Sequence, residues 1–174
     1  MRRVATVGWL LVCALAGLPD QRAPAAEYVL DFGETGPVEC GQEFTLAGLS
    51  CRTEQSAADL CKADDYHGAL LVVDGMLVVD VSTIEGITAV SAVLASYDFD
   101  APGGLSAYHA GTEQVTAVPE SVRWIEELVL DCTELELDEI RVTGAVLVVH
   151  EIRIVAEQVP ATRDRWSTVK RLYR

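Results

Sequence analysis

Residues 69–81 read ALLVVDGMLVVDV, two apolar runs rich in β-branched residues on either side of Asp74-Gly75. An Asp-Gly pair between two such runs is the strongest short-range signal for a β-hairpin. We therefore predict a hairpin with strands at 69–73 and 76–81.

The strand pattern continues in both directions along the chain. Apolar or alternating runs separated by Gly, Pro and Asp predict further strands at 28–32, 43–49, 87–97, 105–110, 112–118, 122–131, 135–142 and 145–155. Turns are expected near Gly111 and at Thr143-Gly144. Many short strands with turn residues between them indicate an all-β, antiparallel β-sandwich, jelly-roll-like in its strand rhythm.

Strand parity predicts which side chains face the core. In 122–131 we expect Trp124, Leu128 and Leu130 to be buried on one side. In the last strand we expect one common face, made up of Val146, Val148, His150, Ile152 and Ile154. On that face His150 is expected to be a core or rim histidine.

The first 26 residues predict export. Arg2 and Arg3 precede an apolar stretch that ends at Leu18, and Ala23-Pro24-Ala25-Ala26 follows a short polar segment. This is the pattern of a cleaved secretory signal peptide, and its apolar core is too short to span a bilayer. We divide the chain into a signal peptide (1–25), a β-sandwich domain (26–160) and a basic tail (161–174), and expect a secreted, extracellular or periplasmic protein without a transmembrane segment in its mature chain. A lipoprotein with Cys13 as the lipidated residue fits less well, because Val12 stands where a small residue is expected.

Four cysteines remain after cleavage, and an even number in an exported protein predicts two disulfides. If 43–49 is one straight strand, Cys40 and Cys51 lie roughly 30 Å apart at about 3.3 Å per residue, too far for a disulfide. We favour Cys51–Cys61 with Cys40–Cys132, and the crossed pairing Cys40–Cys61 with Cys51–Cys132 stays open. A zinc site at Cys51, Cys61 and His67 is disfavoured, since no Cys-x-x-Cys spacing supports it.

The charge distribution is asymmetric. Residues 26–160 hold 25 acidic and 5 basic residues, whereas 161–174 hold 5 basic residues and one acidic residue. The strong negative charge of residues 26–160 repels nucleic acid and anionic lipid. In the tail, Trp166, Val169 and Tyr173 share a face of a short amphipathic segment, helical or disordered, which we expect to contact the acidic body or an acidic partner.

Aromatic and acidic residues meet around 97–104. Flat rings stack on sugar faces, so Tyr97, Phe99, Tyr108 and His109 are candidate ligand-binding residues. Asp98 and Asp100 are candidate ligands for calcium, which prefers oxygen donors. No residue is assigned a catalytic role, because no nucleophile elbow and no His-Glu-x-x-His motif is present.

The segments 76–93 and 147–154, with the hairpin around Ala107-Tyr108, resemble secreted bacterial jelly-roll modules of the carbohydrate-binding kind. The resemblance covers most of 27–156. It implies a β-sandwich that binds a glycan, and such modules often carry a structural calcium. We therefore expect an exported, non-enzymatic binding module for a glycan or a cell-surface protein. The alternatives are a structural or assembly protein of the cell surface or matrix and, third, a carboxylate-dependent enzyme acting on glycans.

Overall fold

The structure is a computed structural model that describes residues 25–35, 38–55, 62–65, 69–97, 103–120 and 124–157. Asp98, Phe99 and Asp100 lie outside these ranges, as do residues 1–24 of the expected signal peptide and the whole tail 161–174. Within them the chain forms ten strands and one short 3₁₀ helix. The elements are β1 (Ala26–Asp31), η1 (Phe32–Glu34), β2 (Glu43–Leu46), β3 (Leu49–Gln55), β4 (Lys62–Asp65), β5 (Leu70–Asp80), β6 (Ile87–Ser96), β7 (Gly104–His109), β8 (Thr112–Ala117), β9 (Ile125–Asp131) and β10 (Glu139–Ala156).

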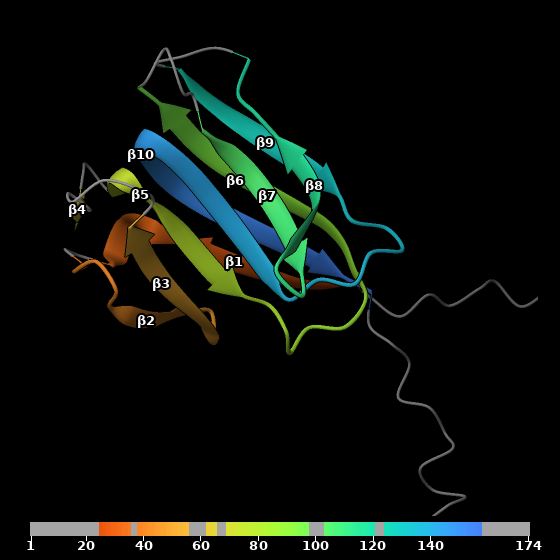
Figure 1. The fold of residues 1–174 in the computed structure, drawn as a ribbon. Coiled ribbons are helices and arrows are strands. Elements are labelled where there is room, and N and C mark those ends of the chain that lie inside the picture. Colours follow the sequence, from red (N-terminus) through yellow and green to blue (C-terminus); the bar gives the residue numbers. More distant parts are fainter. Residues whose placement is uncertain are drawn as a thin grey trace, which may run out of the picture.

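The long strand β10 organises the whole sheet (Figure 1). All strand pairs are antiparallel. The first part of β10 lies between β5 and β7, and its last part lies between β1 and β6. One ladder of strands runs β2-β3-β5-β10-β6-β9, with β4 attached to β5 and β8 attached to β7. Because β10 changes neighbours along its length, one continuous sheet supplies both layers of a sandwich.

The core lies between the two layers. One cluster of buried side chains joins β1 and the end of β10 (Leu30, Ile152) to β5 and β7 (Leu77, Leu105). In Figure 1, β1 and the end of β10 pass behind β5 and β7. The expectation of an all-β antiparallel sandwich is confirmed.

The predicted hairpin at Asp74-Gly75 is wrong, and so is the predicted turn at Thr143-Gly144. Both pairs lie inside continuous strands, β5 and β10, and Gly75 is the direct partner of Gly144. Neither glycine has a positive φ, unlike Gly111 in the β7–β8 turn. Pairing of nearly the whole of β5 with residues 139–149 of β10 satisfies the backbone groups that two separate turns would have left outside the sheet.

The common face predicted for the last strand is interrupted at His150. The β10–β6 register shifts between Val149 and Glu151, which marks a bulge. Leu147 and Val149 face the main core before it, and Ile152 and Ile154 face it afterwards. A bulge adds one residue and so reverses the parity of everything that follows. Val148 instead packs in a small cluster on the other side with Ala69 and Ala95.

The predicted strand 43–49 is a hairpin, β2–β3, that turns at Ala47-Gly48, both with positive φ. The straight-strand distance between Cys40 and Cys51 is therefore wrong. The N–H of Gly41 donates to the carbonyl oxygen of Thr53 at 2.6 Å, so Cys40 lies beside β3.

Cys51 and Cys132 are free and buried. The pairings Cys51–Cys61 and Cys40–Cys132 are therefore wrong, and so is Cys51–Cys132. Both thiols lie in the hydrophobic core, where cysteine behaves as a small apolar side chain. Cys40 is disulfide-bonded, and its partner lies outside the described residues. Cys40–Cys61 stays a prediction.

Trp124 was expected in the core, but it is 71% exposed. It precedes β9, where Leu128 and Leu130 are buried as expected. Ile125 and Val129 on the outer side of β9 are also exposed, at 62% and 60%. Among the described strands, β9 pairs only with β6. The parity prediction held from 128 onward and failed at Trp124 because β9 begins one residue after it.

Candidate binding face

A charged face covers the outer side of the layer formed by β3, β5, β7 and the first part of β10. Ile140 and Val142 of β10 are buried. Glu139 and Arg141 alternate with them along the strand and therefore point outward. Cys51 and Thr53 of β3 are likewise buried, which turns the intervening side chains outward. We call this surface the Arg–Glu face; it consists of Arg52, Glu54, Asp80, Tyr108, Glu139 and Arg141.

Glu139 holds the two arginines of this face together. Its Oε1 accepts from Nη2 of Arg52 at 2.9 Å, and its Oε2 accepts from Nε of Arg141 at 2.9 Å and from Nη2 of Arg141 at 2.5 Å. Nε of Arg52 also donates to Glu54. Because β3 and β10 both contribute to it, the network fixes both guanidinium groups relative to the sheet.

Tyr108 joins the network through its ring and its hydroxyl. The guanidinium carbon of Arg141 lies 3.9 Å from the centre of the Tyr108 ring, a cation–π arrangement. The Tyr108 hydroxyl donates to Oε2 of Glu113 at 3.1 Å. Ring and guanidinium therefore form one stacked unit at the surface.

Ionisation follows this geometry. Burial opposes the charge of Glu139, but hydrogen bonds from Arg141 and Arg52 outweigh burial and hold the pKa of the carboxyl below its usual 4.5. The hydrogen bonds to Glu54 and Glu139 raise the pKa of Arg52. Burial and the bond to Glu113 raise the pKa of Tyr108. At neutral pH the face therefore carries two cationic and several anionic groups with a neutral phenol.

The face is hollowed beside these residues. A depression of about 280 Å³ is lined by Arg52, Asp80, Ser82, Gly111, Asp138, Glu139 and Arg141. Asp80 accepts from the N–H of Ser82 at 2.9 Å, and hydrogen bonds from Ser82 lower the pKa of its carboxyl. Asp138 accepts from the N–H of Ala110 at 2.6 Å. The hollow thus presents fixed donors and acceptors to a polar ligand.

The structure separates the ligand-binding residues that the sequence predicted. Tyr108 pairs with Glu139 on β10, whereas the N–H of Tyr97 donates to the carbonyl oxygen of Val146. These two positions on β10 are seven residues apart, or about 20 Å along a strand. His109 lies next to the Arg–Glu face, with ring nitrogens 3.7 Å from Glu136 and 4.0 Å from Asp138. Tyr108 and His109 therefore adjoin the hollow, and Tyr97 does not.

Sequence reasoning missed Arg52, Glu139 and Arg141. Arg52 and Glu139 are 87 residues apart, so no local pattern joins them. The alternation Glu139-Ile-Arg-Val-Thr143 was the available signal, because it places both charged residues on one side of a strand.

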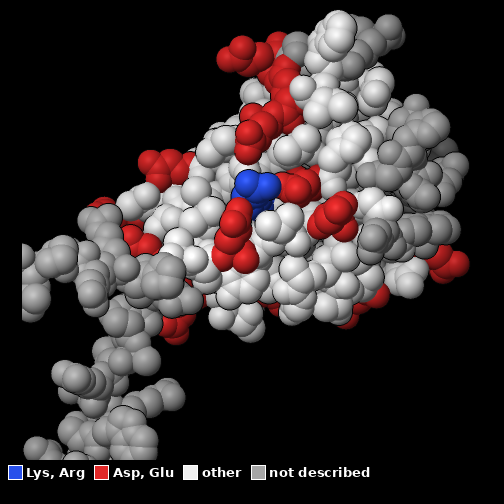
Figure 2. All heavy atoms as spheres, turned by 180° about the vertical axis from the view of Figure 1, so that it is seen from behind, with Lys and Arg blue, Asp and Glu red and all other residues white. Residues whose placement is uncertain are grey.

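The opposite surface of the sandwich carries a similar arrangement. Nε of Arg153 lies 3.2 Å from Glu27, and its Nη2 lies 2.8 Å from Glu151. Ile152 and Ile154 on either side of it are buried, so Arg153 points outward from the other layer. Figure 2 shows the molecule from behind, where acidic side chains surround a small basic patch.

Two classes of site have no support in the part of the chain that the structure describes. It contains no group of three His, Cys, Asp or Glu side chains placed to hold a metal ion. Nor does any helix there have the length and apolar character needed to cross a membrane.

Comparison with solved structures places the fold among carbohydrate-binding β-sandwiches. A variant of the module CBM29-2 complexed with mannohexaose aligns with a TM-score of 0.52 at 11% identity, covering 76% of this chain and 92% of that chain. A CBM29-2 variant complexed with cellulohexaose gives 0.52 at 12% identity over 78% and 93%, and another family 29 carbohydrate-binding module gives 0.51 at 11% over 76% and 89%.

Sequence comparison finds no relative: no family model matches the chain, and no curated protein matches it. At 11–12% identity the likeness establishes the fold. The predicted resemblance to carbohydrate-binding β-sandwich modules is confirmed at that level.

Proposed function

We propose that this protein is an exported, non-enzymatic glycan-binding module that holds its ligand on the Arg–Glu face. The observation that carries the proposal is the network of Arg52, Glu139 and Arg141 beside the Tyr108 ring. The solved structures compared above are carbohydrate-binding modules, two of them complexed with hexasaccharides.

The chemistry of the face suits sugar hydroxyls. Each guanidinium presents several N–H donors in one plane, and the carboxylates supply acceptors. Because Glu139 and Tyr108 already hold the arginines, little side-chain freedom is lost when a ligand binds. Arg52 and Arg141 are outnumbered by Glu54, Asp80, Asp138 and Glu139, so the face favours an uncharged glycan over a uronate or a sulfated chain.

The test compares two arginines in matched surroundings. Arg141→Ala removes a donor of the proposed site that is paired with Glu139. Arg153→Ala removes an arginine that is likewise paired with a glutamate two residues earlier in β10, Glu151, and also with Glu27 of β1, on the opposite surface. We expect Arg141→Ala to weaken binding of mannohexaose or cellohexaose at least about tenfold, the loss of one charged hydrogen bond of about 1.5–3 kcal/mol. Arg153→Ala should leave affinity unchanged.

Isothermal titration calorimetry measures both variants, with circular dichroism as the check on folding. Equal losses from Arg141→Ala and Arg153→Ala, or no binding of any neutral glycan by the wild type, would reject the Arg–Glu face as the site.

Further parts of the proposal rest on the sequence. Export rests on residues 1–26, and the basic tail 161–174 is proposed to contact the acidic body or an acidic partner. A calcium ion at Asp98 and Asp100, with Tyr97 and Phe99 nearby, would be a second feature of the module. A rise in melting temperature with millimolar calcium, lost on Asp98→Ala/Asp100→Ala, tests it.

A second candidate function is assembly with other chains. The exposed side chains of Trp124, Ile125 and Val129 lie on or next to β9, the end of the ladder in the described sheet. Edge strands with apolar side chains pair readily with another strand. Self-association that increases with concentration in analytical ultracentrifugation, and is abolished by Val129→Lys, would favour this function.

A further inference from the structure

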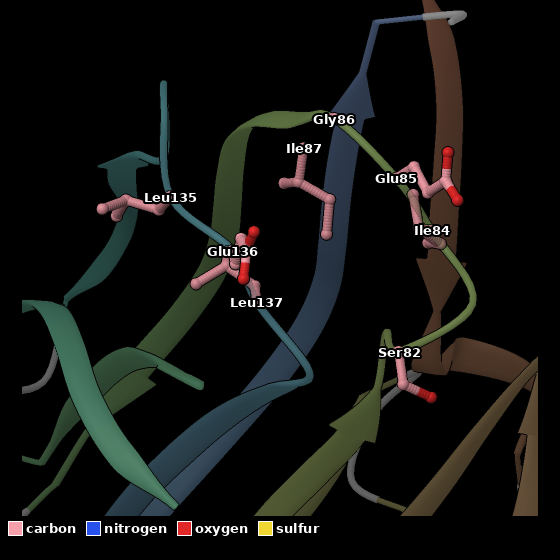
Figure 3. A pocket seen from close by; sticks show the side chains of 8 residues that line it. All are labelled: Ser82, Ile84, Glu85, Gly86, Ile87, Leu135, Glu136 and Leu137. Carbon is pink, nitrogen blue, oxygen red and sulfur yellow. The ribbon is translucent and has the colours of Figure 1, made fainter. Parts of the chain in front are cut away.

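A separate pocket lies at one end of the sandwich, and Figure 3 shows it from close by. It is formed by the connection between β5 and β6 and the connection between β9 and β10. Its volume is about 380 Å³, within the range of roughly 300–1,000 Å³ of small-ligand sites. We call it the end pocket; it is lined by Ser82, Ile84, Glu85, Gly86, Ile87, Leu135, Glu136 and Leu137.

Both walls of the end pocket are fixed to strands. The N–H of Val81 donates to the carbonyl oxygen of Asp138 at 2.9 Å, which joins the two connections directly. The N–H of Glu157 donates to the carbonyl oxygen of Gly86 at 2.9 Å. The N–H of Cys132 donates to the carbonyl oxygen of Thr88 at 2.9 Å. The pocket is therefore preformed, and a ligand need not order either loop.

The pocket combines buried apolar residues with exposed acidic ones, and most of its lining surface is polar. Ile84, Ile87 and Leu137 are buried or nearly so, while the side chain of Glu136 is 89% exposed. Glu85 is exposed as well, and its carboxylate points away from the pocket interior in Figure 3. A sugar ring has polar hydroxyls at its edge and apolar C–H faces; the polar lining suits the hydroxyls, and the smaller apolar part suits a C–H face.

The end pocket and the hollow of the Arg–Glu face are neighbours that share one lining residue. Ser82 lines both depressions, and Leu137 of the pocket is followed directly by Asp138 of the hollow. His109 lies near both Glu136 and Asp138, over the same junction. A chain lying on the Arg–Glu face can thus reach the pocket without crossing an intervening strand.

We infer that the end pocket is a terminal subsite that receives the last sugar of an uncharged oligosaccharide held on the Arg–Glu face. The inference rests on the proposed function and adds end recognition to it. Affinity then rises with chain length until a sugar reaches the pocket. Carboxylates on both depressions disfavour a uronic acid at that end.

The test blocks the pocket and its entrance separately. Leu135→Arg places a long side chain at a half-buried lining position, and Ser82→Trp places a bulky one at the exposed junction. Thr133→Trp is the matched control, because Thr133 is exposed on the same connection and does not line the pocket. Calorimetry with neutral oligosaccharides from two to six units measures the affinity of each folded variant.

We expect the wild type to bind the hexasaccharide about tenfold more tightly than the disaccharide. Leu135→Arg and Ser82→Trp should both remove this gain. Leu135→Arg, at a position outside the Arg–Glu face, should leave disaccharide binding intact, and Thr133→Trp should change neither. Blocked variants that retain the gain, or a wild type with equal affinity at every length, would refute the terminal subsite while the proposed function stands. Absence of binding at every length would overturn both.

Discussion

Replacing Gly144 by alanine adds one methyl group where β5 and β10 cross the middle of the sheet. The new Cβ would lie 2.8 Å from Cγ of Leu147 and 3.0 Å from each of its Cδ atoms. Leu147 is fully buried, so its side chain can yield only by moving into packed neighbours. Overpacking of this kind costs about 1–3 kcal/mol, and the reduced freedom of the unfolded chain returns about 0.4–1 kcal/mol. We expect Gly144→Ala to lower the free energy of unfolding by about 1–2 kcal/mol.

A double-mutant cycle identifies the cause. Leu147→Ala alone should cost about 2–5 kcal/mol through the cavity it leaves. In the double variant the added methyl no longer meets Leu147, so the loss should be smaller than the sum of the two by at least about 1 kcal/mol. Urea unfolding followed by circular dichroism measures all four free energies.

Gly111→Ala is the control for backbone strain. Gly111 has φ +76° and no atom within 4 Å of an added Cβ, so its cost of about 1–2 kcal/mol should not couple to Leu147. If Gly144→Ala behaved in this way, with no coupling to Leu147, Gly144 would lie in a turn and the continuous strand β10 would be refuted.

Two further predictions concern ionisable groups. The pKa of Glu139 is lowered in the folded state, so the contribution of Glu139 to stability is complete above its ordinary pKa of 4.5 and is lost as pH falls through the lower folded value. In acid unfolding, Glu139→Gln should therefore lose less of its free energy of unfolding than the wild type between pH 5 and pH 2. An unchanged profile would contradict the network with Arg52 and Arg141. Burial raises the pKa of the Cys51 and Cys132 thiols to about 11. A thiol reagent at pH 8 should therefore modify neither cysteine in the native protein, and both after unfolding without reductant. Rapid labelling of the native protein would contradict the burial of these thiols.

The sequence predicted local features well and distant partners poorly. The β7–β8 hairpin was placed correctly because Gly111, which has a positive φ, carries the turn signal itself. Asp74-Gly75 carries the same kind of signal, but Gly75 of β5 is the direct partner of Gly144 on the neighbouring strand β10. The pairing of these two long strands decides the structure. Local propensity is overridden where a long-range partner is available.

The candidate site shows the same limit. Tyr108 and His109 were found because aromatic residues near a turn are visible in the sequence. The partners that make Tyr108 part of the Arg–Glu face come from β3 and β10, and strand register brings them together. The bulge at His150 likewise reverses the parity of β10 without any Gly or Pro to mark it.

The position of β10 in the sheet has a consequence for how the protein reaches its fold. Without β10, the described strands fall into separate pieces: β2-β3-β5-β4, β6-β9, β7-β8 and β1 alone. No piece can bury the common core, because that core forms between the layers that β10 joins. Folding therefore requires the last described strand. Because β10 pairs with strands far earlier in the chain, its pairing closes long loops, and we expect folding to be slow and cooperative. A nascent chain that has not yet reached β10 lacks the strand that joins the two layers, so we expect the common core to form only after β10 has been synthesised.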